Sequence, residues 1–219
     1  MKKNIKILFL KKKNCKYCSK ISEILKKKYK KVSISHSIKN QKKINSFDYL
    51  ICFRSQEIIK NKILKQIKIA SINFHPGPPE YRGIGCANWA LYKNEKYYGV
   101  TCHLMDTKID NGDILSVRRF KIGQNYNLEK LLNKTHLKLF NQFKLIEKSI
   151  YEDNFDKFLN KKKKIKWSKK LFKRTELNNL YNIKLNIKKI RLKKILRATL
   201  YGNYKPYIQI HGHKFEYEK

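Results

Sequence analysis

Short apolar runs alternate with amphipathic stretches along the first third of the chain. The apolar runs are short enough for buried strands and cover residues 5–10, 32–35, 48–53 and 68–74. Between them, residues 19–29 and 57–67 carry apolar side chains at helical spacing and predict amphipathic helices. This alternation predicts an α/β fold with a Rossmann-like, doubly wound and mostly parallel sheet.

A proline-rich stretch follows the fourth predicted strand. Three prolines in residues 76–82 remove backbone donors and fix φ, so a rigid loop is expected here. Later elements are a short helix at 86–92, strands at 99–105 and 113–122 around a turn-rich loop at 106–112, and a long helix at 127–149. In sheets of this type ligands bind beyond the carboxyl ends of the strands. We therefore expect the site near residue 75.

The end of the chain is predicted to form a small separate unit. Lysines at residues 161–166 indicate an exposed connector. Residues 186–197 are predicted to be helical, and residues 207–217 to form a terminal β-hairpin. We assign residues 1–155 to a catalytic domain and residues 156–219 to a C-terminal α+β subdomain, large enough to add a wall to the site or a contact in a homodimer.

The chain is strongly basic. Its 53 Lys and Arg residues against 16 Asp and Glu residues give a formal net charge of +37. Such a charge is typical of proteins that bind nucleic acid or anionic membranes. Here, however, the excess is mostly lysine spread from Lys2 to Lys219, whereas dedicated nucleic-acid binders concentrate arginine and aromatic residues on one face. We interpret the charge as compositional drift, which is compatible with an anionic small substrate and does not favour a nucleic-acid partner.

The apolar runs also bear on location. None approaches the roughly 18 residues that a membrane span needs. The N-terminus is basic and then briefly apolar, but Lys11, Lys12 and Lys13 follow at once without a small-residue cleavage site. We expect neither a signal peptide nor a membrane segment, and a cytoplasmic location.

The five cysteines form no even, closely spaced framework and are expected to be thiols. Two of them, Cys15 and Cys18, form a C-x-x-C motif between the first predicted strand and helix, the placement typical of redox-active pairs. A structural zinc site would need two more ligands, and no second pair follows. A redox role therefore stands beside the simpler interpretation that these are incidental small residues in a turn.

A candidate catalytic group lies around the fourth strand. Asn73 and His75 are two positions apart on that strand, so their side chains face the same side of the sheet. Asp110, 35 positions after His75 (110 minus 75), lies on a loop that can return to the same edge. An amide to stabilise an oxyanion, an imidazole to move a proton and a carboxylate to orient it support acyl transfer to an amine. No nucleophile elbow is present and nothing is evidently placed to activate Cys86, so direct attack by the amine is expected.

Each of these residues alone has an ordinary structural explanation, but their order and spacing resemble a known family. The segments N-F-H-P-G-P-P-E-Y-R-G and Y-G-V-T-C-H-L-M-D-T-K-I-D-N-G-D-I-L closely resemble formyltransferases that use 10-formyltetrahydrofolate. That family includes enzymes for glycinamide ribonucleotide, methionyl-tRNA and sugar nucleotides. The resemblance implies that Asn73 donates to the formyl oxygen, His75 transfers the proton, and Asp110 holds the charge and position of His75.

The resemblance also implies binding residues and no metal. The folate co-substrate would contact the main chain around Cys52, Phe53 and Arg54 and around Ile109, Asn111 and Gly112. The acceptor would contact Pro76, Gly77, Tyr81, Arg82 and Arg118. His103, Asp106 and Asp113 flank the site and are interpreted as packing, turn and loop residues.

The proline-rich loop and the hairpin tail look most like bacterial enzymes that formylate a nucleotide-linked 4-amino-4,6-dideoxyhexose for O-antigen synthesis. We therefore expect an enzyme with a dTDP-amino-sugar substrate and folate as partners. Two alternatives remain. One is formylation of another amine, including that of methionyl-tRNA, and the other, of a different class, is a basic RNA-binding or C-x-x-C redox protein.

Overall fold

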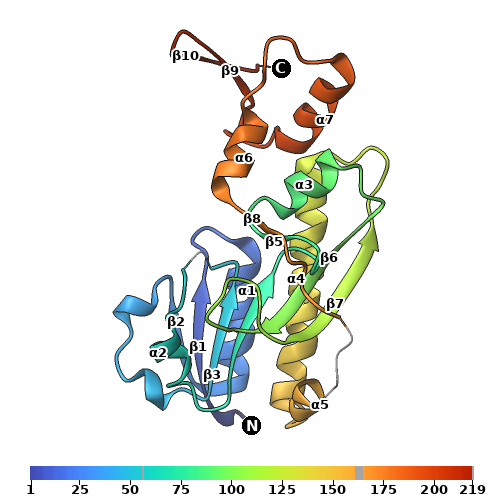
Figure 1. Cartoon of the computed structure of the whole chain (residues 1–219). Helices are drawn as coiled ribbons and strands as arrows, with labels where there is room; N and C mark the ends of the chain where they lie inside the picture. The colour runs from blue at the N-terminus through green and yellow to red at the C-terminus, as the bar shows by residue number, and fades with distance from the viewer. Residues whose placement is uncertain (56, 161–164, 219) are drawn as a thin grey trace.

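A computed structural model of the protein describes residues 1–55, 57–160 and 165–218 (Figure 1). Its centre is a six-stranded sheet of order β2-β1-β3-β4-β6-β7. The strands are β1 (Lys3–Lys11), β2 (Tyr29–Ser35), β3 (Tyr49–Phe53), β4 (Ala70–His75), β6 (Tyr97–Leu104) and β7 (Ile114–Lys121). The first four are parallel, and β6 runs antiparallel to both β4 and β7. The predicted mostly parallel α/β sheet is confirmed.

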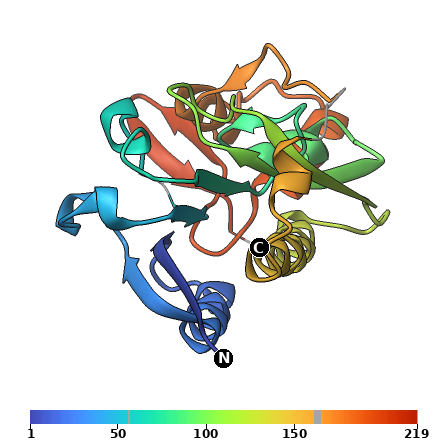
Figure 2. The same cartoon turned by 90° about the horizontal axis from the view of Figure 1, so that it is seen from below.

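Two long helices cover one face of the sheet, α1 (Lys16–Lys28) and α4 (Leu128–Tyr151). Figure 2 shows them on the same side of the strands. Ile7 and Phe9 of β1 point to this face, into the core that α1 and α4 complete. Leu8 and Leu10 point to the other face, into a second cluster. Both faces of β1 are therefore buried, which explains why its sequence is a continuous apolar run.

The opposite face carries shorter elements. They are the helical turns η1 (Ile38–Asn40) and η2 (Ile44–Ser46) and the single-turn helix α2 (Asn61–Leu64). The predicted amphipathic helix at 57–67 is thus wrong except for that one turn. The Glu57 carboxylate accepts hydrogen bonds from Ser37 Oγ and the Ile38 amide, so the chain is pinned to a distant loop before a helix can begin.

The C-terminal part of the chain packs beside α3 (Cys86–Tyr92), as Figure 1 shows in orange and red. It contains β8 (Leu171–Phe172), α6 (Arg174–Tyr181), α7 (Lys189–Thr199), and the hairpin of β9 (Tyr207–Ile210) and β10 (His213–Glu216). The preceding helix α5 (Asp156–Leu159) lies at the opposite end of the molecule, near the N-terminus (Figure 1). The predicted hairpin is confirmed, and α7 begins and ends within three residues of the predicted helix. Helix α6 and strand β8 were not predicted.

The C-terminal segment also reaches back toward the sheet. Strand β8 pairs in parallel with the two-residue strand β5 (Arg82–Gly83), which lies at the end of the proline-rich loop. The boundary at residue 155 stays a prediction, and most of the connector predicted at 161–166 lies outside the described residues.

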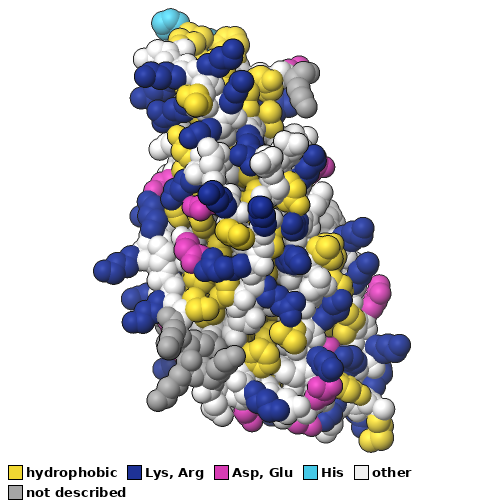
Figure 3. All heavy atoms as spheres, turned by 90° about the vertical axis from the view of Figure 1, so that its right-hand side faces the viewer, with side chains coloured by type: hydrophobic (Ala, Val, Ile, Leu, Met, Phe, Trp, Pro, Cys, Tyr) yellow, Lys and Arg dark blue, Asp and Glu magenta, His cyan; other side chains and the backbone are white. Residues whose placement is uncertain are grey.

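On the face shown in Figure 3, the basic side chains are not gathered into one patch. Figure 3 shows Lys and Arg side chains dispersed over the whole visible face and interleaved with apolar and neutral ones. Within the described part of the chain, no helix has the length and apolar character needed to cross a membrane.

Candidate active site

A cavity of about 670 Å³ opens at the carboxyl ends of β3 and β4. Here the sheet changes from parallel to antiparallel pairing, and the volume is typical of small-molecule sites. The walls come from six parts of the chain: the ends of β1, β3 and β4, strand β5 with the residue after it, the loop after β6, and the C-terminal segment. They include Lys12, Cys52, Arg54, Ser55, Ile58, Ile59, Asn73, His75, Pro76, His103, Met105, Lys108, Ile109, Asp110, Phe172, Lys173 and Arg174.

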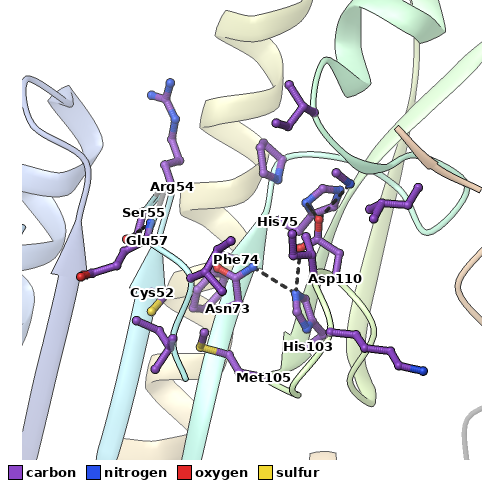
Figure 4. Close-up of a pocket in the computed structure, with 18 of the residues that line it drawn as sticks. Cys52, Arg54, Ser55, Glu57, Asn73, Phe74, His75, His103, Met105 and Asp110 are labelled. Carbon is purple, nitrogen blue, oxygen red and sulfur yellow. Dashed lines mark hydrogen bonds and ion pairs between the residues drawn. The ribbon is translucent and has the colours of Figure 1, made fainter. Parts of the chain in front are cut away.

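Asn73 lies opposite His103 in the β4–β6 register. The Asn73 amide nitrogen Nδ2 is 3.0 Å from His103 Nε2, as the dashed line in Figure 4 marks. His103 Nδ1 lies 2.7 Å from the carbonyl oxygen of Leu104, which can only accept, so Nδ1 carries a proton, and Nε2 is the atom in contact with Asn73. This contact orients the amide and leaves its second N–H for a ligand in the cavity.

His75 is 3% exposed and has acceptors at both ring nitrogens. Nε2 lies 2.8 Å from the Tyr81 carbonyl oxygen, and Nδ1 lies 3.3 Å from Asp110 Oδ2. Burial lowers the pKa of His75, although the Asp110 charge and the Tyr81 carbonyl act in the opposite direction. A neutral ring can donate to only one of these two acceptors and a protonated ring donates to both, so a partner for a second proton is already in place.

Asp110 is held as a carboxylate. It lies on the loop after β6 with a positive φ of 44°, a conformation that Asp tolerates better than most residues. Oδ2 accepts a hydrogen bond from the Gly83 amide at 2.9 Å, and Oδ1 is 3.5 Å from His103 Nε2. Burial opposes ionisation, but His75, His103 and the Gly83 amide outweigh it and hold the pKa of Asp110 well below its usual range.

Trp167 closes the site from the C-terminal side. Its ring lies edge-on to His75 and His103, with ring centroids 5.7 Å and 5.0 Å apart. Its Nε1 donates to the Gly112 carbonyl at 2.8 Å and so holds the loop that carries Asp110. Arg82 links the same loop to the C-terminal segment, because its guanidinium donates to the carbonyls of Ile109 and Ser168.

The structure places the predicted catalytic residues together, but only some of the predicted binding residues line the cavity. Cys52, Arg54, Ile109 and Pro76 do. The others lie outside its wall: Phe53, Asn111, Gly112, Gly77, Tyr81, Arg82 and Arg118.

The reasons are geometric. Phe53 follows Cys52 on β3 and so faces the opposite side of the sheet, where it packs against Phe74 and Phe143. The Tyr81 hydroxyl points away and donates to Glu95. Arg118 lies on the edge strand β7, beyond β6.

Four residues that contribute to the site were not predicted from the sequence. His103 was interpreted as a packing residue, but it contacts both Asn73 and Asp110. The signal in the sequence was limited to alternation: His103 shares a face of its strand with Thr101, but only the β4–β6 register places that face at the site. Trp167 and the C-terminal cations Lys173 and Arg174 had no such signal.

Cys86 lies close to the site but is not an activated nucleophile. Its Sγ is 3.7 Å from His75 Nε2 and donates to the Tyr81 carbonyl at 3.1 Å. Burial raises the pKa of Cys86, and the Asp110 charge adds to the effect, so the thiol stays protonated.

Comparison with known proteins gives matches in sequence. The family model described as formyl transferase matches residues 5–143. The bifunctional polymyxin resistance protein ArnA of Wigglesworthia glossinidia brevipalpis is 37% identical over 119 residues, which are 48% of this chain and 18% of that protein. The methionyl-tRNA formyltransferase of Mycoplasmopsis pulmonis is 30% identical over 142 residues, 64% of this chain and 49% of that protein. The chain therefore spans less than half the length of either curated relative.

Solved structures share the fold over nearly the whole chain. A 4-N formyltransferase from Francisella tularensis superposes with a TM-score of 0.77 at 22% identity, covering 99% of this chain and 100% of that one. An N-formyltransferase from Helicobacter canadensis, in complex with folinic acid and dTDP-3-aminofucose, superposes with a TM-score of 0.70 at 19% identity, covering 96% of this chain and 86% of that one. Since the family model alone matches more than half of the 219 residues, the chain belongs to the formyl transferase family.

Proposed function

We propose that the protein transfers a formyl group from 10-formyltetrahydrofolate to the amine of a nucleotide-linked amino sugar of the dTDP-4-amino-4,6-dideoxyhexose type. The observation that carries this proposal is the meeting of Asn73, His75 and Asp110 at one wall of the cavity in a chain of the formyl transferase family. We further propose that it acts in the cytoplasm, in O-antigen biosynthesis.

The residues on the β3 side of the cavity fit a folate. Ile58, Ile59 and Met105 offer apolar surface for a flat ring system, and the main chain after β3 offers hydrogen-bonding groups at its edge. When bound, the formylated folate supplies an activated one-carbon unit. Asn73, at the adjacent strand end, is the side chain placed to donate to the oxygen of that unit.

Proton transfer falls to His75 and Asp110. The attacking amine must lose a proton, and the neutral His75 ring together with the Asp110 carboxylate, 3.3 Å apart between Nδ1 and Oδ2, takes it up. The resulting imidazolium has a partner at each N–H, the Asp110 carboxylate and the Tyr81 carbonyl. Because both partners are fixed in a site that Trp167 covers, little reorganisation accompanies the charge that develops.

The cations of the cavity support an anionic acceptor. Lys108, Lys173 and Arg174 lie in the wall on the side of the C-terminal segment, and a sugar nucleotide carries a diphosphate that these side chains can pair with. The Helicobacter canadensis structure contains a dTDP-amino sugar together with folinic acid. The name of the Francisella tularensis structure specifies a 4-N formyltransferase.

A methionyl-tRNA acceptor is the second candidate, favoured by the name and identity of the Mycoplasmopsis pulmonis relative. Formylation assays with a dTDP-4-amino-4,6-dideoxyhexose and with methionyl-tRNA, each with the same formyl donor, distinguish the two. We expect turnover with the sugar nucleotide, and turnover with methionyl-tRNA alone contradicts the proposed acceptor.

The Asn73→Ala variant tests the chemistry itself. Loss of an oxyanion donor typically costs on the order of 100-fold to 1,000-fold in kcat. Asn178→Ala, which removes an exposed amide on α6, is the matched control and should retain full activity. An Asn73→Ala enzyme that keeps its kcat would show that the amide is not the oxyanion donor.

A further inference from the structure

The C-x-x-C motif forms a close pair of thiols at the start of α1. Cys15 is the residue before the helix, with extended backbone, and Cys18 lies in its first turn. The Cys18 amide donates to the Cys15 carbonyl at 3.0 Å, so the two residues are joined by a tight turn. Residues three apart in such a turn have Cα atoms within about 7 Å, which overlaps the range of roughly 4.4–6.8 Å that a disulfide spans. Both are free thiols in this structure.

The two thiols differ in access. Cys15 is 8% exposed, whereas Cys18 is 1% exposed and its Sγ lies 3.9 Å from the Phe53 carbonyl oxygen, which it faces as a donor. An external reagent therefore reaches Cys15 first, and Cys18 can act only on a group already attached to Cys15.

Positive charge surrounds the outer thiol. The Arg54 guanidinium Nη1 is 3.7 Å from Cys15 Sγ, and the thiol lies at the N-terminus of a 13-residue helix. Lys12 lies in the turn before Cys15. Burial, together with the positive charges of Arg54 and Lys12, lowers the pKa of the nearby His136 of α4 to about 3. A hydrogen bond from Cys18 lowers the pKa of Cys15 to about 5, with burial opposing and Arg54 assisting.

We propose that Cys15 and Cys18 are a reactive dithiol that exchanges with small-molecule disulfides and closes to an intramolecular disulfide. The Cys15 thiolate attacks one sulfur of a disulfide RS–SR, forms a mixed disulfide and releases RS⁻. Cys18 then gives its proton to the released RS⁻, attacks Cys15 Sγ and displaces the second RS⁻. The protein gives up two electrons and the small disulfide takes them up. This site lies outside the formyl-transfer chemistry and does not depend on it.

A metal site is the competing explanation for paired cysteines. A structural zinc ion needs four ligands. Among the residues that the structure describes, no group of three or more His, Cys, Asp or Glu side chains is placed to hold a metal ion. The neighbours of the thiols are cations, which repel a metal ion and stabilise a thiolate.

Alkylation of the full-length protein tests the reactivity of Cys15. Under limiting iodoacetamide, peptide mass spectrometry should show Cys15 labelled before the buried Cys52 and Cys86. Its rate should be nearly constant between pH 6 and pH 8, whereas an ordinary thiol reacts about tenfold faster per pH unit in this range. Below some pH the labelling rate decreases because the thiolate is protonated, and Arg54→Met should raise that pH by about one unit. Arg119→Met, which removes a surface guanidinium paired with Glu80, should leave it unchanged.

Treatment with glutathione disulfide tests the exchange. The wild-type protein should lose two hydrogens without gaining an adduct, Cys18→Ser should accumulate one mixed disulfide at Cys15, and Cys15→Ser should show neither product. Circular dichroism of each variant checks its fold. Labelling of Cys15 no faster than that of Cys52, or a folded Cys18→Ser protein without an adduct, would overturn the proposal.

Discussion

Replacement of Asp110 by Asn isolates the role of its charge. Asn tolerates the positive φ at this position, and its amide oxygen can still accept from the Gly83 amide, so the loop should keep its conformation. What disappears is the negative charge 3.3 Å from His75 Nδ1. Asp113→Asn, an exposed position on the same loop, is the matched control.

The size of the effect follows from Coulomb's law. Unit charges 3.3 Å apart attract by about 5 kcal/mol at an effective dielectric constant of about 20. The dipole of an Asn oxygen restores part of this, so we expect the transition state to lose about 3–4 kcal/mol. That corresponds to a fall in kcat/KM of about 100-fold to 1,000-fold.

Steady-state kinetics with the formyl donor and the sugar nucleotide at neutral pH measures this fall, and thermal unfolding checks that the variant is folded. Asp113→Asn should stay within about twofold of the wild-type enzyme. A folded Asp110→Asn enzyme with kcat/KM within about threefold of wild type would refute the assignment of Asp110 as the residue that stabilises protonated His75.

Two further predictions concern packing and pH. A Cβ at Gly77 would lie 2.7 Å from His75 Nε2, so Gly77→Ala should lower both the free energy of unfolding, by about 1–3 kcal/mol, and kcat. Urea denaturation measures the first effect and the formylation assay the second. If neither quantity changes, the close packing of Gly77 against His75 is contradicted. Burial lowers the pKa of His136 to about 3 in the folded protein, below its value of about 6.5 when unfolded. As the pH falls below 6.5, the unfolded chain is protonated at His136 while the folded protein is not. The free energy of unfolding should therefore decrease by about 3 kcal/mol between pH 7 and pH 4. In urea denaturation at several pH values, His136→Gln should remove this pH dependence of the free energy of unfolding, whereas His213→Gln on the exposed hairpin should keep it. The same pH dependence in both variants would refute the prediction.

The parts of the fold that local patterns determine could be predicted from the sequence. The apolar runs at β1 and β3 are continuous because both faces of these strands are buried, whereas apolar and polar residues alternate along β4. The pair Asn73 and His75 follows from strand alternation alone. Most of the helix expected at 57–67 does not form, because the Glu57 carboxylate accepts hydrogen bonds from Ser37 and Ile38. These residues are about 20 positions away, too far for the pattern of neighbouring residues to indicate the contact.

The rest of the site depends on contacts between distant segments. His103 reaches Asn73 only because β6 pairs antiparallel with β4 in one register, which is set by the whole sheet. Trp167 reaches His75 because the chain returns after α4 to pair β8 with β5. Neither contact can be predicted from the spacing of nearby residues in the sequence.

That returning segment has a consequence for how this architecture can diversify. The family model ends at residue 143, yet Trp167, Lys173 and Arg174 contribute to the cavity or cover it. If the proposed function holds, transfer of the one-carbon unit and recognition of the acceptor are divided between two stretches of chain. Changes in the later stretch can retune which amine is accepted while the groups that handle the one-carbon unit stay untouched.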